Sequence, residues 1–312
     1  MNAYRWLALP SVLALVVLVA SQILTDRIGA LQFLWWTPRI ALAVPAFTLL
    51  MLLLFAAWIL RAPVRARREL AAGVGAALLV GVWCTWSDWG FARAPDGDAF
   101  RFAHWNACSV NREEAPKAIN AIIAFDADAV LLTDPGAAFS GDGAARLEEL
   151  GYAIHRAGRF AIISRAPVVE ATPIYSARGR SLSRFVLATA QGRLAIDAVD
   201  LPSETTMPRY ISVRNFVAEV EPLRGEAADL VVGDFNITRG SASLSLLAPG
   251  AVEAFAASGA GWGGTFPREW PLFAIDQTLV NPGWKALRSR IVDPGLTRHR
   301  AQRVDLVSRA IN

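Results

Sequence analysis

Hydrophobic side chains dominate the first 90 residues, whereas apolar and polar positions alternate in the rest of the chain. Three early segments, residues 6–24, 40–60 and 70–86, contain no Asp, Glu, Lys or Arg. A helix needs roughly 20 apolar residues to cross a bilayer. Buried helices of a soluble core are the alternative, but these segments show no polar face. The pattern therefore predicts a membrane region, residues 1–90, with three transmembrane helices, the third at the short end of the range.

Basic residues predict the orientation of these helices. Arg61, Arg65, Arg67 and Arg68 crowd the link between the second and third segments, and such links lie in the cytoplasm. Everything after residue 86 is then extracytoplasmic, although Arg39 in the outer link weakens the asymmetry. We predict a multi-pass protein of the bacterial inner (plasma) membrane whose carboxy-terminal domain faces outward, into the periplasm of a Gram-negative cell.

The remaining residues predict an α/β domain. Residues 91–99 contain Pro, Gly and two Asp and indicate a linker. Helical patterns at 113–125, 143–150 and 209–223 then alternate with strand-like runs, among them 129–133, 184–189, 194–201 and 229–233. Alternation of this kind is typical of an α/β fold. A domain of residues 100–312 is long enough to bury a substantial core.

Polar side chains follow several of the predicted strands. The apolar run 230–232 leads through Gly233, which allows the backbone to turn, into Asp234 and Asn236. Two residues apart in an extended chain, these side chains lie on the same side. Their oxygens suit a hard cation or a phosphate, although short turns also use such residues as caps. Asn106 and Asp134 also end predicted strands. His104 lies two residues before Asn106 and so on the same face, but a histidine at the edge of a strand more often has a structural role.

The order of these segments carries more information than any one of them. It runs through Phe102–Asn106, Asp126–Asp134, Gly158–Pro167, Gly233–Asn236, Thr265–Pro267, Ile275–Val280 and Thr297–Arg300. This succession resembles the endonuclease/exonuclease/phosphatase superfamily of metal-dependent phosphoesterases, and within it bacterial proteins that carry the domain behind membrane helices. The resemblance covers about residues 100–310. It implies a four-layer sandwich of two mixed β-sheets flanked by helices.

The resemblance also implies roles for individual residues. Asp276 is expected to fix the tautomer and steady the charge of His299. Asp234 is expected to orient or deprotonate the attacking water, and Asn236 to donate to a phosphate oxygen. Asp134 and Asn106 occupy the positions of the superfamily's ligands for Mg²⁺ or Mn²⁺. The residue at the position of Asn106 also contacts the phosphate, so the same is expected of Asn106.

Three positions depart from the superfamily pattern. Asp134 replaces a Glu, Asp200 replaces a His, and Arg298 replaces the carboxylate before His299. We expect Asp200 and Arg298 to lie near the substrate phosphate, where a guanidinium matches phosphate oxygens bidentately. Asp200 is an alternative metal ligand. These changes are compatible with altered chemistry or with lost chemistry.

Two functions follow from the sequence. The first is a membrane-anchored, metal-dependent phosphoesterase that acts outside the cytoplasm. The second is a catalytically impaired homologue that binds a phosphorylated ligand or a partner. A lipid headgroup or a nucleic acid is compatible with the first, although the net charge of +4 is too small to indicate nucleic acid. The two cysteines, Cys84 and Cys108, predict neither a disulfide nor a zinc site, and no protein partner can be inferred.

Overall fold

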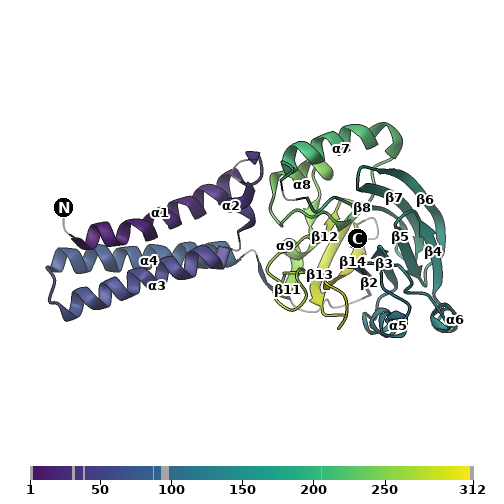
Figure 1. The fold of residues 1–312 in the computed structure, drawn as a ribbon. Coiled ribbons are helices and arrows are strands. Elements are labelled where there is room, and N and C mark those ends of the chain that lie inside the picture. Colours follow the sequence, from purple (N-terminus) through teal and green to yellow (C-terminus); the bar gives the residue numbers. More distant parts are fainter. Residues whose placement is uncertain are drawn as a thin grey trace. The chain divides into compact units, whose positions relative to one another are not determined.

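The computed structural model describes residues 3–29, 32–37, 39–86, 88–92, 98–204 and 206–309. The chain divides into two compact units between Asp88 and Trp89. Most of the predicted linker, residues 93–97, lies outside the described residues. Figure 1 shows a helical first unit and a second unit built mainly from strands.

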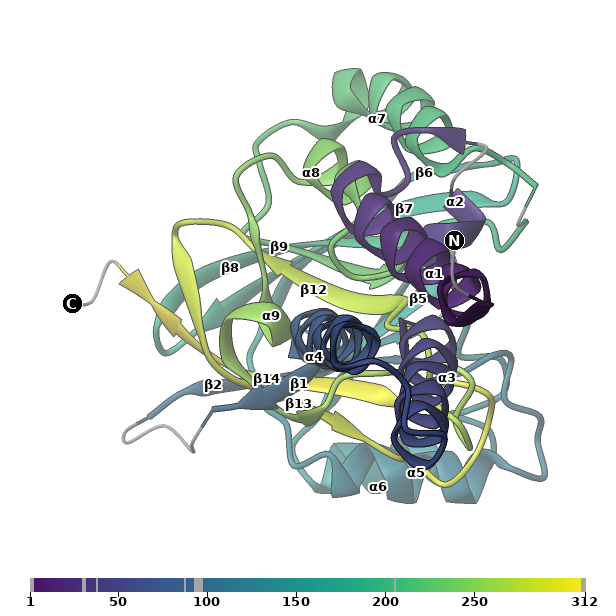
Figure 2. The same ribbon diagram turned by 90° about the vertical axis from the view of Figure 1, so that its left-hand side faces the viewer.

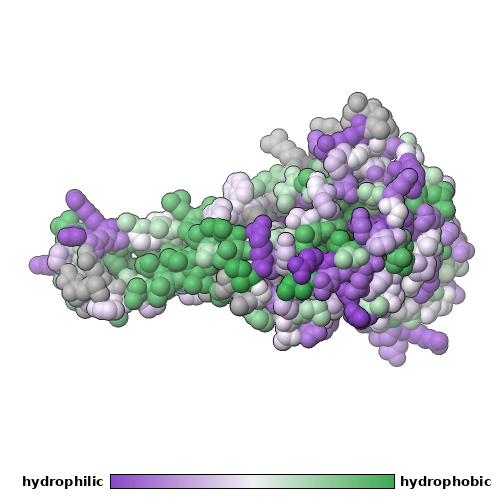
Figure 3. All heavy atoms as spheres, turned by 90° about the horizontal axis from the view of Figure 1, so that it is seen from above, coloured by the Kyte–Doolittle hydropathy of each residue, from purple (hydrophilic) through white to green (hydrophobic). Residues whose placement is uncertain are grey.

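Four helices make up the first unit. They are α1 (Ala3–Leu24), α2 (Gln32–Trp36), α3 (Arg39–Ile59) and α4 (Val64–Trp86). Leu15 and Leu50 pack with small residues of α3 and α4 in the interior. Large apolar side chains nevertheless remain exposed on the outside, and Figure 3 shows them covering this unit, with hydrophilic residues gathered at the end where α3 and α4 are joined. An exposed apolar surface of this extent is unusual for a soluble monomer.

One of the three predicted spans has the length and composition of a membrane-crossing helix in the described part of the chain, Trp6–Leu24. The apolar part of α3, Ala43–Ile59, is shorter. Helix α4 begins with a charged turn around Arg65 and Glu69, and its apolar part is rich in Ala and Gly, which lowers its hydropathy. The described chain thus contains one candidate membrane span, and the sequence prediction of three was wrong.

Two mixed sheets form the centre of the second unit. The larger has the order β1-β11-β13-β14-β2-β3-β5-β4, and the smaller has the order β10-β12-β9-β8-β7-β6. The strands of the larger sheet are β1 (Trp89–Phe91), β2 (Phe100–Asn106), β3 (Ala129–Thr133), β4 (Ala153–Ala157), β5 (Phe160–Ser164), β11 (Gly259–Trp262), β13 (Trp284–Val292) and β14 (Ala301–Ser308). Those of the smaller are β6 (Val168–Ala177), β7 (Arg180–Thr189), β8 (Gly192–Asp200), β9 (Leu230–Asp234), β10 (Val252–Glu253) and β12 (Asp276–Val280).

Helices cover the outer faces of both sheets. Helices α5 (Ala115–Ala124) and α6 (Gly143–Glu149) pack on the larger sheet, and α7 (Arg209–Arg224) and α8 (Ala242–Leu247) pack on the smaller. The short helix α9 (Ala254–Ser258) connects β10 to β11. Figure 2 shows α7 and α8 on one side of the strands and α5 and α6 on the other. The predicted α/β fold of two mixed sheets flanked by helices is confirmed.

The alternation of residues along the central strands explains this layering. In β2, Phe100 and Phe102 enter the core between the sheets, whereas Ala103 and Trp105 pack against α5. In β9, Val232 enters the same central core, and Val231 faces α7 and α8. Successive side chains of a strand point to opposite faces. A strand buried on both faces therefore carries the nearly continuous apolar sequence seen here.

Candidate active site

The same alternation places the predicted polar residues between the two sheets. Asn106 follows Phe102 by four residues in β2, and Asp234 follows Val232 by two in β9. An even spacing along a strand keeps side chains on one face. Asn106 therefore points from the larger sheet toward the smaller sheet, and Asp234 points back. The contact is direct, since Asn106 Nδ2 donates a hydrogen bond to Asp234 Oδ2 at 2.8 Å.

Three carboxylates lie side by side at this end of the smaller sheet. Asp234 of β9 is the register partner of Asp200 in β8 and of Asp276 in β12. Strands β8 and β9 are parallel and end here, whereas β12 is antiparallel to β9 and begins here. Register partners project from the same face of a sheet. Residues separated by more than 30 positions in sequence thus converge on one site.

Gly233 permits the close approach of β8 and β9. A Cβ at this position would lie 1.7 Å from the carbonyl oxygen of Val199. The sequence analysis assigned Gly233 to a turn, and this was wrong because the residue is part of β9. The turn comes later, at Asn236, whose φ is 49°. Its backbone N–H donates to Asp234 Oδ1 at 3.0 Å and holds that carboxylate in place.

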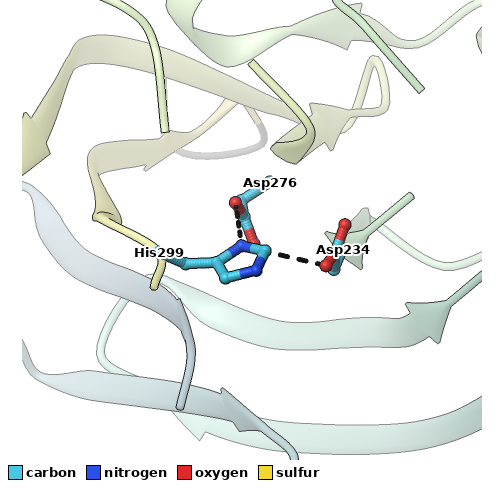
Figure 4. Close-up of side chains that lie close together, drawn as sticks. All are labelled: Asp234, Asp276 and His299. Carbon is cyan, nitrogen blue, oxygen red and sulfur yellow. Dashed lines mark hydrogen bonds and ion pairs between the residues drawn. The ribbon is translucent and has the colours of Figure 1, made fainter. Parts of the chain in front are cut away.

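His299 and Asp276 form a buried pair (Figure 4). The Nδ1 atom of His299 lies 2.9 Å from Asp276 Oδ2 and 3.8 Å from Asp234 Oδ2. Thr265 helps to position Asp276, because its hydroxyl oxygen accepts a hydrogen bond from the backbone N–H of Asp276 at 3.2 Å. The ring of Phe266 lies 4.8 Å from the imidazole, centroid to centroid. The structure therefore brings together Asn106, Asp234, Asp276 and His299, as the resemblance implied.

The pair is charged. Burial lowers the pKa of His299, but the negative charge of Asp276, its hydrogen bond and smaller contributions from Cys108 and Asp234 outweigh burial and raise this pKa to about 11. Burial raises the pKa of Asp276, yet the charge of His299 and its hydrogen bond hold it below its ordinary value. The pair is therefore an imidazolium–carboxylate pair at neutral pH.

The pKa of Asp234 is shifted in the opposite direction to that of Asp276. Burial and the neighbouring charge of Asp276 raise its pKa to about 8, against the attraction of His299. A carboxylate with this pKa keeps its proton at neutral pH until further positive charge enters the site. Asp234 is thus suited to exchange a proton near neutral pH, as a general base requires.

A second group of residues joins the two sheets at the rim of the site. Asp134, just after β3, accepts the hydroxyl of Ser109 at 2.6 Å. The guanidinium of Arg159 contacts two carboxylates: its Nη2 atom is 3.5 Å from Asp134 Oδ2, and its Nε atom is 3.2 Å from Asp200 Oδ2. Burial raises the pKa of Asp200 to about 6, and Arg159 opposes this shift. Among the described contacts, none joins Asp134 to Asn106, so the two predicted metal ligands do not touch.

The remaining predicted residues lie at the edge of the site. The Asn236 amide donates to the carbonyl oxygen of Leu201 at 2.7 Å, so this donor is already engaged. Arg298 is exposed, and its guanidinium lies 5.3 Å from the centre of the Phe266 ring. His104 is buried, contacts Thr133 Oγ1 at 3.0 Å, and has its pKa lowered to about 4 by burial. His104 is therefore neutral, and this hydrogen bond fixes its ring.

Sequence reasoning missed Arg159 and Thr265 as parts of the site. Both belong to segments that carried the family resemblance, but their contacts are set by the packing of one sheet on the other. Arg159 reaches from the turn between β4 and β5 to Asp200 in β8. No local sequence pattern encodes a contact between sheets. The one sequence feature that could have pointed to Arg159 is its position directly before a buried strand.

The donor set fits a divalent cation. Four carboxylates, those of Asp134, Asp200, Asp234 and Asp276, meet the two cations Arg159 and His299 within the described site. Asp276 Oδ1 is buried and has no hydrogen-bond partner among the described residues. Carboxylate oxygens of Asp234 and Asp276 also lie within 4.8 Å of each other and of His299, which as an imidazolium has no lone pair to offer a metal. Excess negative charge and oxygen donors are what Mg²⁺ and Mn²⁺ require.

Solved structures share this fold at low sequence identity. An endonuclease/exonuclease/phosphatase from Bacteroides vulgatus is 19% identical with a TM-score of 0.51, covering 68% of this chain and 100% of its own. A Bacteroides thetaiotaomicron mannosyl-6-phosphatase is 16% identical with a TM-score of 0.50, covering 67% and 100%. D. rerio TDP2 complexed with a single-strand DNA product is 11% identical with a TM-score of 0.50, covering 68% and 100%.

Curated proteins gave no significant sequence match. A family model does match, over residues 103–299, which are more than half of the chain and include every predicted site residue. This range begins in β2, at Ala103, and ends at His299 in the site. The chain belongs to the Endonuclease/Exonuclease/phosphatase family.

Proposed function

We propose that this protein is a membrane-anchored, metal-dependent phosphoesterase that acts outside the cytoplasm. The observation that carries the proposal is the convergence of Asn106 and Asp234 from opposite sheets beside the charged pair of His299 and Asp276. A phosphoester is an anion that repels nucleophiles, so its hydrolysis needs positive charge and an activated water. This site contains a group for each requirement.

Each residue has a role that its surroundings support. Asp234 accepts the proton of the attacking water, and Asn106 holds its carboxylate through Nδ2. The His299 imidazolium, fixed by Asp276, faces the negative charge of the phosphoryl oxygens. Asp134 and the amide oxygen of Asn106 would hold Mg²⁺ or Mn²⁺, with Asp200 as a further oxygen donor. The bound cation supplies charge neutralisation for the phosphate and the leaving oxygen.

Metal dependence tests the enzyme directly. We expect the full chain in detergent to hydrolyse a generic phosphodiester or phosphomonoester with Mg²⁺ or Mn²⁺, and to lose at least about 100-fold of that rate in a chelator. Hydrolysis is followed by release of a chromogenic alcohol. Full recovery on adding the metal back is the control for irreversible unfolding.

The alternative is a binding protein without turnover. Asp200, Arg298 and the pairing of Arg159 with Asp134 favour it, because they alter the residues around the predicted metal. Absence of hydrolysis with either metal, for both substrate types, would establish this alternative. Parallel assays with phospholipid vesicles and single-stranded DNA then separate a lipid headgroup from a nucleic acid as the substrate.

The helical unit supports the proposed membrane anchor. Its exposed apolar side chains include Leu13 and Val16 on α1, Leu52 and Phe55 on α3, and Leu79 on α4. In water this surface would promote aggregation, whereas hydrocarbon solvates it. A single crossing by α1 would place the second unit on the side of the membrane opposite to the amino terminus.

Fractionation tests the anchor and its topology. We expect the chain to remain with bacterial membranes after alkaline carbonate extraction, and its second unit to be digested when protease is added to spheroplasts. The control is a cytoplasmic protein that stays intact in the same sample. Release of the chain by carbonate, or digestion only after lysis, would contradict this proposal.

A further inference from the structure

Arg159 holds two carboxylates that come from different sheets. It lies in the turn between β4 and β5, and its backbone oxygen accepts the N–H of Asp134 at 2.9 Å. Its side chain then spans to Asp200 in β8. The guanidinium therefore stands between the residue proposed to bind the metal and the carboxylate that is register partner to Asp234.

The burial of the three side chains differs. The Arg159 side chain is 47% exposed, whereas those of Asp134 and Asp200 are 33% and 11% exposed. The cation of this pair is half-exposed, so solvent screens its attraction for the carboxylates. The guanidinium can turn into solvent at small cost, but Asp200 stays fixed in its strand. Of the three groups, the cation is thus the one that can leave.

Charge explains why a cation is needed at this place. Asp134 and Asp200 repel each other, Asp276 also repels Asp200, and Arg159 is the cation that pairs with Asp134 and Asp200 among the described residues. A divalent ion on Asp134 would bring two positive charges against the guanidinium. Both cannot hold the same carboxylate oxygens.

We infer that Arg159 is the resident counter-cation of this metal site: it neutralises Asp134 and Asp200 before a divalent cation binds, and it gives them up when the cation arrives. The inference rests on the proposed function, because it takes Asp134 as a metal ligand. Once displaced, the guanidinium stands at the rim with its N–H groups available to phosphate oxygens.

Mn²⁺ binding tests the inference without requiring turnover. Arg159→Met removes the charge and keeps most of the side-chain volume. We expect the full-length variant in detergent to bind Mn²⁺ about tenfold or more tightly than the wild type, because a competing positive charge is lost. Arg159→Lys should stay near the wild type. Free Mn²⁺ is counted by electron paramagnetic resonance in one buffer used for all variants.

Two further variants locate the effect. Arg193 lies at the end of β8 opposite to Asp200, is 55% exposed, and has its partner Glu226 4.0 Å away in the loop between α7 and β9. The Mn²⁺ affinity of Arg193→Met should be unchanged. Adding Asp134→Asn to Arg159→Met should abolish the gain. Equal or weaker Mn²⁺ binding by Arg159→Met, or no binding by any variant, would overturn the inference.

The result is separable from that of the hydrolysis assay. Metal-dependent turnover together with equal Mn²⁺ affinities leaves the proposed function intact and removes the role of Arg159. Tighter Mn²⁺ binding by Arg159→Met without turnover in any variant keeps the counter-cation and removes the enzyme.

Discussion

The His299→Ala variant is expected to lower kcat/KM for a phosphodiester by about 10²- to 10⁴-fold, the range typical of a lost acid–base or charge-stabilising group. His299 is the cation nearest to Asp234 among the described residues, and it is held by Asp276. Without it, the substrate phosphate would face two buried carboxylates without a compensating imidazolium. The measurement is steady-state hydrolysis by the full chain with Mn²⁺.

The variant also leaves Asp276 buried without its partner, which costs stability of about 3–5 kcal/mol. Circular dichroism must therefore show that the protein is folded at the assay temperature. His299→Gln provides a second test, because it retains a hydrogen-bond donor but no charge, and it should lose activity to a similar degree. His155→Ala, on β4, is the matched control. Activity of His299→Gln within about twofold of the wild type would rule out an essential role for the charge.

The layers of the fold were predictable because they follow from local patterns. The strand 129–133 and the helix 113–125 were visible as an apolar run and as a helical spacing of apolar residues, and the structure has a strand and a helix there. The family order of motifs added the pairing of the two sheets. The membrane helices were predicted less well, since apolar length alone did not separate α1 from the Ala- and Gly-rich α4.

The site was predictable in part for a physical reason. Asp234 and Asp276 end or begin buried strands, so their position along the chain indicates a shared edge of a sheet. The contact of Arg159 with Asp134 and Asp200 depends on how one sheet rests on the other. The amide of Asn236 was expected to face phosphate, but its positive φ turns it to the Leu201 carbonyl. Backbone conformation after a strand is not encoded by alternation.

Gly233 connects the fold to the site. Its own Cα is register partner to Val199, one position before the pair of Asp234 and Asp200. We expect Gly233→Ala to reduce the free energy of unfolding of the second unit by about 3 kcal/mol or more, because backbone atoms cannot yield as a flexible side chain does. Denaturant titration followed by circular dichroism measures this loss in the full chain.

The matched control is Gly283→Ala, where the nearest atom to the added Cβ is a carboxylate oxygen of Asp229 at 3.3 Å, which can move aside. At Gly233 the nearest atom is a backbone oxygen of β8, so relief requires β8 and β9 to separate. Separation would move Asp200 away from Asp234 and so change the positions of a metal ligand and of the general base.

Hydrolysis should therefore fall even under conditions where Gly233→Ala is fully folded. A folded Gly233→Ala variant with wild-type stability and turnover would show that the spacing of β8 and β9 does not set the geometry of the carboxylates.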